Sequence, residues 1–312
     1  MTTMTTRDIG RVVQTPPPAP GFIGEGHTAV EVVNPADFLQ NDPFIVLMDD
    51  RVDLPPGGRA GGAHPHAGFE IATFLVEGEL RDRDEGVLRG GDVMWTTAGS
   101  GVIHNEDVEA FGKTRILQLW MTLPSAERWS RPRFAHMARD AVPVRQEPGV
   151  SARVYSGRSG QIEAPAHTYL PLTMIDIHMD AGRSFEQTLP ASFNGFVYVL
   201  DGEAKAGTRT LVAGQVGWLA EVHASTSSEL HLETGEHGAR VMLYAGERQR
   251  TPIAPPTLRL RAPLRRAARR IGFRRGRARA AHGPSKCPAS RHAGTGAGAG
   301  CRGRRPYADA CR

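Results

Sequence analysis

The chain has 312 residues, of which 40% are apolar, enough to build the cores of two ordinary domains. Frequent glycine and proline with few aromatic residues favour a turn-rich all-β protein over a helical bundle. No run of 18 apolar residues exists, which excludes a transmembrane helix and a membrane partner. Residues 1–14 lack the apolar core of a secretory signal, and all three cysteines lie in the last 26 residues, so we expect a cytoplasmic protein without structural disulfides.

The net charge of +5 conceals two oppositely charged parts. Residues 248–312 contain 17 Arg and one Lys against one Asp, a net charge of +17. Residues 1–247 contain 20 basic and 32 acidic residues, a net charge of −12. An acidic body argues against a nucleic-acid-binding surface there, so nucleic acid is a candidate partner for the Arg-rich tail alone.

The N-terminal part of the chain leads towards the first strands. Residues 1–28 are predicted to form an N-terminal arm, because the proline-rich stretch at 15–21 cannot form a helix or a central strand. Short apolar runs with β-branched residues predict strands at 30–33 and 44–48. Residues 49–63, rich in Gly, Pro and Asp, predict a loop that leads to His64.

Two pairs of potential metal ligands follow, His64-Pro65-His66 and His104-Asn105-Glu106. Residues i and i+2 of a strand point to the same face, so two such strands facing each other in a small barrel would aim three imidazoles and one carboxylate at one point. This donor set suits Fe, Mn, Ni, Cu or Zn, and the lack of thiolate argues against a closed structural zinc site. A single histidine is usually an ordinary core or surface residue, but two ligand pairs separated by strand-like sequence favour a metal site.

The sequence between and after these pairs predicts further strands near 69–76, 93–95 and 115–123, with a charged hairpin at 81–86. Four aromatic residues in these strands either line an apolar pocket or belong to the core, and the pattern leaves both open: Phe69, Phe74, Trp95 and Trp120.

The second half of the chain repeats the first. Residues 193–203 align with 69–79 at an offset of 124, and 214–218 align with 91–95 at an offset of 123, which predicts two similar domains. The positions aligned with His64, His66 and His104 are Thr188, Pro190 and Ser227, and Glu229 aligns with Glu106. We therefore expect the second domain to keep the fold and to lack the metal. The histidines of this half are expected to be surface residues.

Residues 248–312 form a basic, low-complexity tail that cannot bury enough apolar surface to offset the entropy of ordering, so we expect it to be disordered. Three interpretations remain open. The tail is an inert solvated segment, it binds nucleic acid or another acidic surface, or it is the product of a frame change in the coding DNA.

Several motifs in the same order resemble the pirin family. They are His-Pro-His-x-Gly-Phe-Glu at 64–70, Glu-Gly-Glu at 77–79, Gly-Asp-Val-x-Trp at 91–95, Thr-Ala-Gly-x-Gly-x-x-His-x-Glu at 97–106, and Leu-Gln-Leu-Trp at 117–120. The resemblance runs from about residue 44 to 247. It implies a tandem cupin (bicupin) of two jelly-roll-like β-barrels, a metal-binding barrel over 29–135 and a degenerate barrel over 136–247. Ala67 departs from the family pattern, in which Arg is common, and this puts the substrate in doubt.

The resemblance also implies a site and an activity. In the family, the residues matching His64, His66, His104 and Glu106 hold one divalent ion, usually Fe(II), with Mn, Ni, Cu and Zn as the alternatives. The implied enzyme is a dioxygenase that opens a flavonol such as quercetin with O2, with Glu106 also accepting the substrate's hydroxyl proton. The alternative is a non-catalytic, metal- or redox-sensing regulator that binds a partner protein. Other small-molecule chemistry, such as isomerisation, is the third possibility, because a fold does not fix a function.

Overall fold

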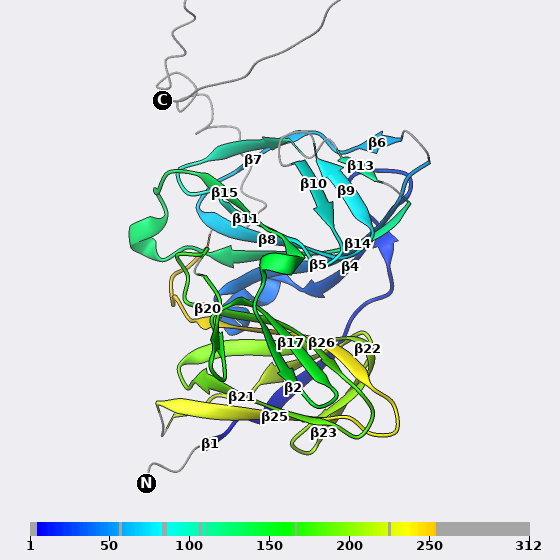
Figure 1. Ribbon diagram of the computed structural model, residues 1–312. Coiled ribbons are helices and arrows are strands. Elements are labelled where there is room, and N and C mark those ends of the chain that lie inside the picture. Colours follow the sequence, from blue (N-terminus) through cyan, green and yellow to red (C-terminus); the bar gives the residue numbers. More distant parts are fainter. Residues whose placement is uncertain are drawn as a thin grey trace, which may run out of the picture. The chain divides into compact units, whose positions relative to one another are not determined.

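The computed structural model describes residues 5–253, except 56–57, 83–85, 106–107, 111, 166 and 224–225. The described residues belong to one structural unit. The chain forms two β-barrels. The first is drawn in blue to green, and the second is drawn in green to yellow together with the dark blue strands from the start of the chain (Figure 1). The predicted all-β, two-barrel architecture is therefore confirmed.

In the described residues, the first barrel is built from three sheets. Its largest sheet has the strand order β15 (Arg133–Met137), β11 (Val93–Thr97), β8 (Phe69–Glu77), β14 (Lys113–Thr122), β5 (Phe44–Asp53), β4 (His27–Val33), β3 (Ala19–Pro20). A second sheet has the order β10 (Gly86–Arg89), β9 (Glu79–Asp82), β13 (Val108–Ala110), β6 (Arg59–Ala60). The third is the antiparallel pair β7 (Ala63–His66) and β12 (Val102–Asn105).

The second barrel has one main sheet, with the path β1 (Thr5–Thr6), β25 (Ser227–Glu233), β22 (Phe193–Ala206), β26 (Ala239–Glu247), β20 (Leu172–Met179), β17 (Val150–Ser156), β16 (Val144–Glu147). Four strands pair off this path: β2 (Ile9–Gln14), β24 (Gln215–Leu219), β21 (Ser184–Pro190), β23 (Arg209–Val212). A short hairpin, β18 (Arg158–Ser159) and β19 (Ile162–Glu163), follows β17. Strands β1 and β2 come from the predicted arm and pair with β25 and β24, so the start of the chain completes the second barrel.

Helical structure is sparse. The described part has the short helix α1 (Phe38–Asn41) and three 3₁₀ turns, Pro35–Asp37, Ser125–Glu127 and Arg139–Ala141. The first turn is capped by Asn34, whose side chain accepts a hydrogen bond from the Ala36 amide. None of these described helices has the length and apolar composition needed to cross a bilayer.

The backbone conformation explains why one glycine is repeated in the two halves of the sequence. Gly78 and Gly202 hold equivalent places in the two halves, and both adopt a positive φ, 91° and 70°. A Cβ atom at Gly202 would lie 1.9 Å from the Gly238 carbonyl oxygen, and one at Gly78 would lie 2.6 Å from the Lys113 carbonyl oxygen. Any other residue would be strained and would clash here, which explains why both halves carry glycine.

The two barrels share one hydrophobic core. Phe44 of β5 contacts Phe196 of β22 edge to face, with ring centroids 5.1 Å apart, and both pack beside Trp218. Two buried tyrosines of the second barrel also donate hydrogen bonds to the first. The Tyr155 hydroxyl bonds the Gly91 carbonyl at 2.7 Å, and the Tyr198 hydroxyl bonds Asp49 at 2.7 Å. This core lies between the barrels and is separate from the interior of the second barrel.

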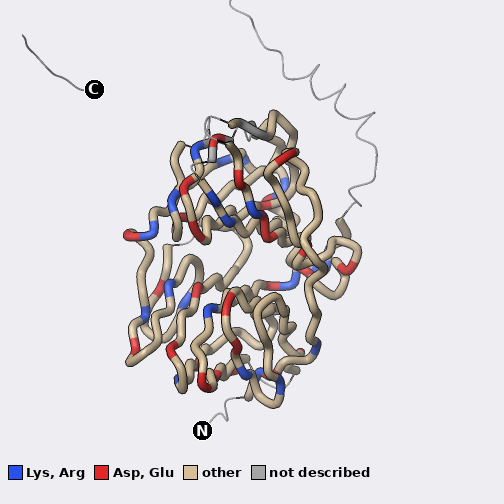
Figure 2. The backbone as a smooth tube through the Cα atoms, turned by 90° about the vertical axis from the view of Figure 1, so that its right-hand side faces the viewer, with Lys and Arg blue, Asp and Glu red and all other residues tan. Residues whose placement is uncertain are grey.

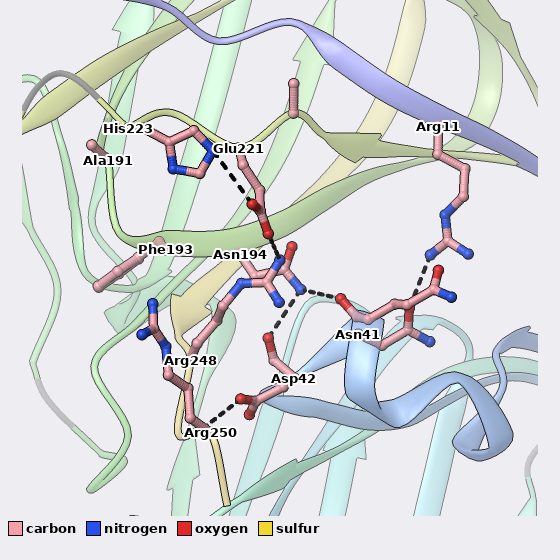
Figure 3. Close-up of polar contacts among 12 residues, drawn as sticks. Arg11, Asn41, Asp42, Ala191, Phe193, Asn194, Glu221, His223, Arg248 and Arg250 are labelled. Carbon is pink, nitrogen blue, oxygen red and sulfur yellow. Dashed lines mark hydrogen bonds and ion pairs between the residues drawn. The ribbon is translucent and has the colours of Figure 1, made fainter.

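A polar cluster joins the α1 region to the second barrel (Figure 3). The Asn194 side-chain amide donates to the backbone carbonyls of Gln40 and Asp42 at 3.0 and 2.9 Å. The Asp42 carboxylate accepts hydrogen bonds from the backbone amides of Gln249 and Arg250. The first residues beyond the predicted barrel boundary at 247 are therefore bound to the body of the protein.

Basic and acidic residues are interspersed over both barrels in the view of Figure 2. The Arg-rich tail, in contrast, lies outside the described residues from 254 onwards. Its predicted disorder and its three interpretations therefore stay predictions.

Candidate metal centre and its surroundings

Strands β7 and β12 bring three of the four predicted metal ligands together. The antiparallel register places His104 directly opposite His64 and Val102 opposite His66. The ring centroids are 4.5 Å apart for His64 and His66, 5.3 Å for His64 and His104, and 5.6 Å for His66 and His104. His66 and His104 are buried and His64 is half-buried. As strand geometry predicts, the two histidines of β7, spaced i and i+2, lie on the same face of the strand.

The centroid separations of the three rings can be compared with those of imidazoles that share a metal ion. With metal–nitrogen bonds of about 2.1 Å, two imidazoles on one ion have centroids about 4.6 Å apart at a right angle and about 5.3 Å apart at a tetrahedral angle. All three separations lie near this range. Among the described residues, no group of three or more His, Cys, Asp or Glu side chains is placed so that it could hold a metal ion. The fourth predicted ligand, Glu106, lies outside the described residues.

A backbone contact sets the tautomer of His64. Its Nδ1 lies 2.9 Å from the Gly62 carbonyl oxygen, which can only accept a hydrogen bond. Nδ1 therefore carries a hydrogen, and in the neutral ring Nε2 carries the lone pair. This is the arrangement that an Nε2 metal ligand requires, because the outer hydrogen bond orients the ring and raises its basicity.

Aromatic side chains surround the three imidazoles. Phe69 and Trp120 stack on each other with centroids 4.7 Å apart and an interplanar angle of 21°. The His66 ring contacts both edge on, at 5.4 and 5.2 Å. On the other side, Phe134 lies 6.4 Å from His104, nearly parallel to it, and 69%-exposed Phe22 lies 6.2 Å from His64. The site therefore offers an apolar, partly open surface next to the predicted ligands.

Of the four aromatic residues, two lie beside the predicted metal ligands and two belong to the core. Phe69 and Trp120 contact His66, as a pocket lining requires. Phe74 and Trp95 are buried in the core shared by the barrels. Sequence alone could not separate these pairs, because alternation along a strand assigns faces only once the register is known.

Glu70, one strand position beyond Phe69, is a buried carboxylate that sequence reasoning missed. Its oxygens accept hydrogen bonds from the Thr97 hydroxyl at 2.8 Å and from the backbone amides of Tyr169 and Leu170 at 3.1–3.3 Å. Burial raises the pKa of Glu70, and these hydrogen bonds oppose the rise. Tyr169 and Leu170 belong to the second barrel, so Glu70 ties its loop to the strand that follows the predicted metal ligands. The sequence signal that could have indicated this buried carboxylate is a single Glu within an otherwise apolar strand.

The second barrel shows a one-residue shift from the sequence alignment at the ligand positions. Thr188 and Pro190, which align with His64 and His66, are exposed on β21, whereas Gln187 and Leu189 are buried. Across the strand pair, Gln187 lies opposite Leu230, as His64 lies opposite His104. The inward positions 187, 189 and 230 thus carry an amide and two leucines, and none of the three is a histidine.

Two histidines of the second half, His223 and His231, contact surface carboxylates. His231 lies 3.3 Å from Glu186 and 3.5 Å from Glu233, and His223 lies 3.6 Å from Glu221. The side chain of His231 is 40% exposed and that of His223 is 82% exposed, in agreement with the predicted surface positions.

Two barrels of this topology, joined in tandem and related by a sequence repeat, define a two-domain cupin. The family model "Pirin" matches residues 29–121, and the model "Pirin C-terminal cupin domain" matches residues 174–255. The chain is 30% identical over 249 residues to Pirin-1 of Arabidopsis thaliana, covering 75% of this chain and 81% of that relative. The chain belongs to the pirin family, as its motifs predicted.

Solved structures agree with this assignment. The GK1651 protein of Geobacillus kaustophilus is 34% identical, with a TM-score of 0.72 over 80% of this chain and 100% of that one. A quercetin 2,3-dioxygenase of Acinetobacter baumannii is 25% identical, with a TM-score of 0.65 over 78% of this chain and 81% of the other.

Proposed function

We propose that this protein is a metal-dependent dioxygenase that opens a flavonol such as quercetin with O2. The observation that carries the proposal is the cluster of three imidazoles beside a stacked aromatic pair. The ring spacing supports a shared ion, and the pair Phe69–Trp120 supports a flat aromatic substrate next to it. The likeness to the quercetin 2,3-dioxygenase of Acinetobacter baumannii adds support from the same fold.

In this proposal, His64, His66, His104 and Glu106 hold one divalent ion, with Fe(II) as the preferred metal and Mn, Ni, Cu and Zn as the alternatives. When bound, the ion supplies Lewis acidity and brings substrate and dioxygen together. The Gly62 carbonyl keeps His64 in the tautomer that presents Nε2. Glu106 accepts the proton of the flavonol hydroxyl, because a carboxylate next to the ion is the nearest predicted base.

The protein's own side chains also orient the substrate. Phe69 and Trp120 provide the apolar face against which the fused rings lie, and the edge contact of both with His66 fixes that face relative to the ligand. Phe22 and Phe134 flank the other two imidazoles and reduce the access of water to the reacting groups.

The test is oxygen uptake by the full chain loaded with Fe(II) and given quercetin. We expect uptake by the wild type and its loss in His66→Ala, while the surface control His231→Ala keeps the wild-type rate. Undiminished turnover in His66→Ala would reject the metal mechanism. Absence of uptake with each of the five metals would reject the enzyme and favour a regulator that binds a partner protein.

A further inference from the structure

A cleft of about 460 Å³ lies where the two barrels meet, and its size is within the range typical of sites for small organic molecules. One wall is formed by Val76 of β8 and by the turn 90–91 before β11. The other wall is formed by side chains of β17, β20 and β26, and Arg139 of the third 3₁₀ turn completes the lining. Val76 lies seven positions along β8 from Phe69, or about 23 Å along an extended strand. The cleft is therefore separate from the three-imidazole cluster, which lies beside Phe69.

Three arginines line this cleft. Arg153 on β17 and Arg240 on β26 flank the central strand β20. The stem of Arg139 lies against Gly91, where a Cβ atom would come within 2.6 Å of the Arg139 Cδ. Burial, followed by the charge of a nearby carboxylate, raises the pKa of the Tyr155 phenol in this cleft, and the charges of the three arginines oppose the rise. The three guanidinium groups therefore lie near one another, around the Tyr155 hydroxyl.

One carboxylate balances one of the three positive charges. Asp176 on β20 accepts two hydrogen bonds from the Arg240 guanidinium, at 3.0 and 2.9 Å, and it is the one acidic residue among the described residues that line the cleft. Arg153 donates a hydrogen bond to the backbone carbonyl of Arg139 at 2.9 Å. Within the described part of the chain, neither of these two arginines forms an ion pair with a carboxylate. Three arginines against one aspartate give the cleft a net charge of +2, in a body whose net charge is −12.

This charge and these donors suit a phosphoryl group. A guanidinium donates two parallel hydrogen bonds to two oxygens of a phosphate or a carboxylate, and Arg139 and Arg153 are both available for this because no carboxylate pairs with them in the described part of the chain. The phosphoryl group of a monoester carries a charge of about −1.5 to −2 at pH 7, which matches the +2 of the cleft, whereas a carboxylate carries a single charge. Ser151, on the same wall, adds a hydroxyl donor.

We propose that the cleft between the barrels binds a small phosphate monoester, with Arg139 and Arg153 holding its phosphoryl group. Because the two walls belong to different barrels, the bound ester ties the barrels together and stabilises their junction. The site uses neither the predicted metal ligands nor the aromatic pair Phe69–Trp120, so it does not depend on whether the first barrel is a dioxygenase.

The test is titration calorimetry of the full chain with phenyl phosphate, which is mainly a dianion at about pH 7.5. The Arg-rich segment from residue 248 onwards also attracts anions, so the buffer contains salt at about 0.15 M, which screens exposed charges. We expect one equivalent of phenyl phosphate to bind saturably to the wild type and to His104→Ala, which lacks a predicted metal ligand. Phenol, which has the same ring without the phosphoryl group, should not compete.

Variants of the cleft locate the binding. Arg153→Gln and Arg139→Gln should each weaken binding about 10-fold or more through the loss of charged hydrogen-bond donors. Arg153→Gln also removes the bond to the Arg139 carbonyl, so Arg139→Gln, whose exposed side chain forms no hydrogen bond in the described part of the chain, is the cleaner variant. Arg209→Gln is the matched control, because it removes the same charge from an exposed position on β23 and should leave the affinity unchanged. Phenyl phosphate should also raise the Tm of the wild type and of Arg209→Gln, but not that of Arg139→Gln.

The proposal is overturned if phenyl phosphate does not bind saturably to the wild type, or if its affinity is unchanged in both Arg139→Gln and Arg153→Gln. It is also overturned if Arg209→Gln weakens binding as much as they do, which would assign the binding to surface charge in general, or if binding disappears in His104→Ala, which would assign it to the first barrel. Oxygen uptake reports separately on the first barrel, so failure of the dioxygenase proposal and failure of this one give different results.

Discussion

Replacing Arg7 by methionine tests how the start of the chain holds the second barrel together. Arg7 follows β1 and is 2% exposed. Its guanidinium donates hydrogen bonds to one hydroxyl and four backbone carbonyls at 2.8–3.2 Å, those of Ser228, Phe193, Ala220, Pro190 and Ala191. Methionine keeps an unbranched apolar side chain but leaves these five acceptors without their donor.

The magnitude follows from the number and type of these bonds. A hydrogen bond from a charged donor contributes about 1.5–3 kcal/mol, but five bonds to one group are not additive. A buried acceptor left without its donor costs about 1–3 kcal/mol, and because the five losses are not additive we expect Arg7→Met to cost about 3–5 kcal/mol in all. That is a large part of the ~5–15 kcal/mol that stabilises a typical protein.

The assay is urea unfolding followed by circular dichroism. With an m value of about 3 kcal/mol per molar, the midpoint of Arg7→Met should fall by about 1–2 M. Arg11→Met is the matched control. Arg11 lies on β2, makes one hydrogen bond to Asn41 and packs 5.1 Å from the Trp218 ring, so we expect a loss of only about 1 kcal/mol. Equal midpoints for the two variants would refute the role assigned to Arg7.

Three further predictions concern Glu70, Tyr198 and Trp120. Burial raises the pKa of Glu70, so the folded state binds the carboxyl proton more tightly than the unfolded chain does. The stability that the protonated Glu70 contributes is therefore largest at low pH and declines as the pH rises through the raised pKa. Glu70→Gln should remove this pH dependence and lower the free energy of unfolding by about 1–3 kcal/mol, because an amide N–H then faces backbone donors. Urea midpoints of the wild type and the variant that change in parallel from pH 4 to 7 would contradict this. Tyr198→Phe should cost about 1–2 kcal/mol by removing the 2.7 Å bond to Asp49, measured by thermal unfolding, and an unchanged Tm would show that the bond adds nothing. Trp120→Leu should raise KM for quercetin about 10-fold with metal content unchanged, and an unaltered KM would remove Trp120 from the substrate surface.

The features that could be predicted from the sequence are those that follow from local periodicity and from the repeat. The i, i+2 spacing of His64 and His66 turned both rings to one face, and the repeat of residues 69–79 at 193–203 predicted two similar domains. Both follow from rules that act over a few residues. The sequence also predicted that the two ligand-bearing strands meet at one place, and in the structure β7 and β12 lie side by side as an antiparallel pair.

Long-range features were beyond these rules. Strands β1 and β2 pair with strands more than 200 residues later, and no local sequence pattern predicts pairing over such a distance. At β21, alignment by motif offset selected Thr188 and Pro190, whereas the register buries Gln187 and Leu189. A shift of one residue exchanges the two faces of a strand, so alignment alone cannot assign inward positions. Glu70 was missed for a related reason, since its partners lie about 100 residues away.

Elemental analysis of the purified full chain tests the central claim most directly, which is that three imidazoles and a carboxylate of the first barrel hold one ion. The account predicts one equivalent of a transition metal per chain in the wild type and in the surface variant His231→Ala. It predicts less than a tenth of that in His104→Ala, with the fold retained by circular dichroism. Metal content that is the same in His104→Ala and the wild type, or absent from a wild type loaded with each candidate metal, would contradict it.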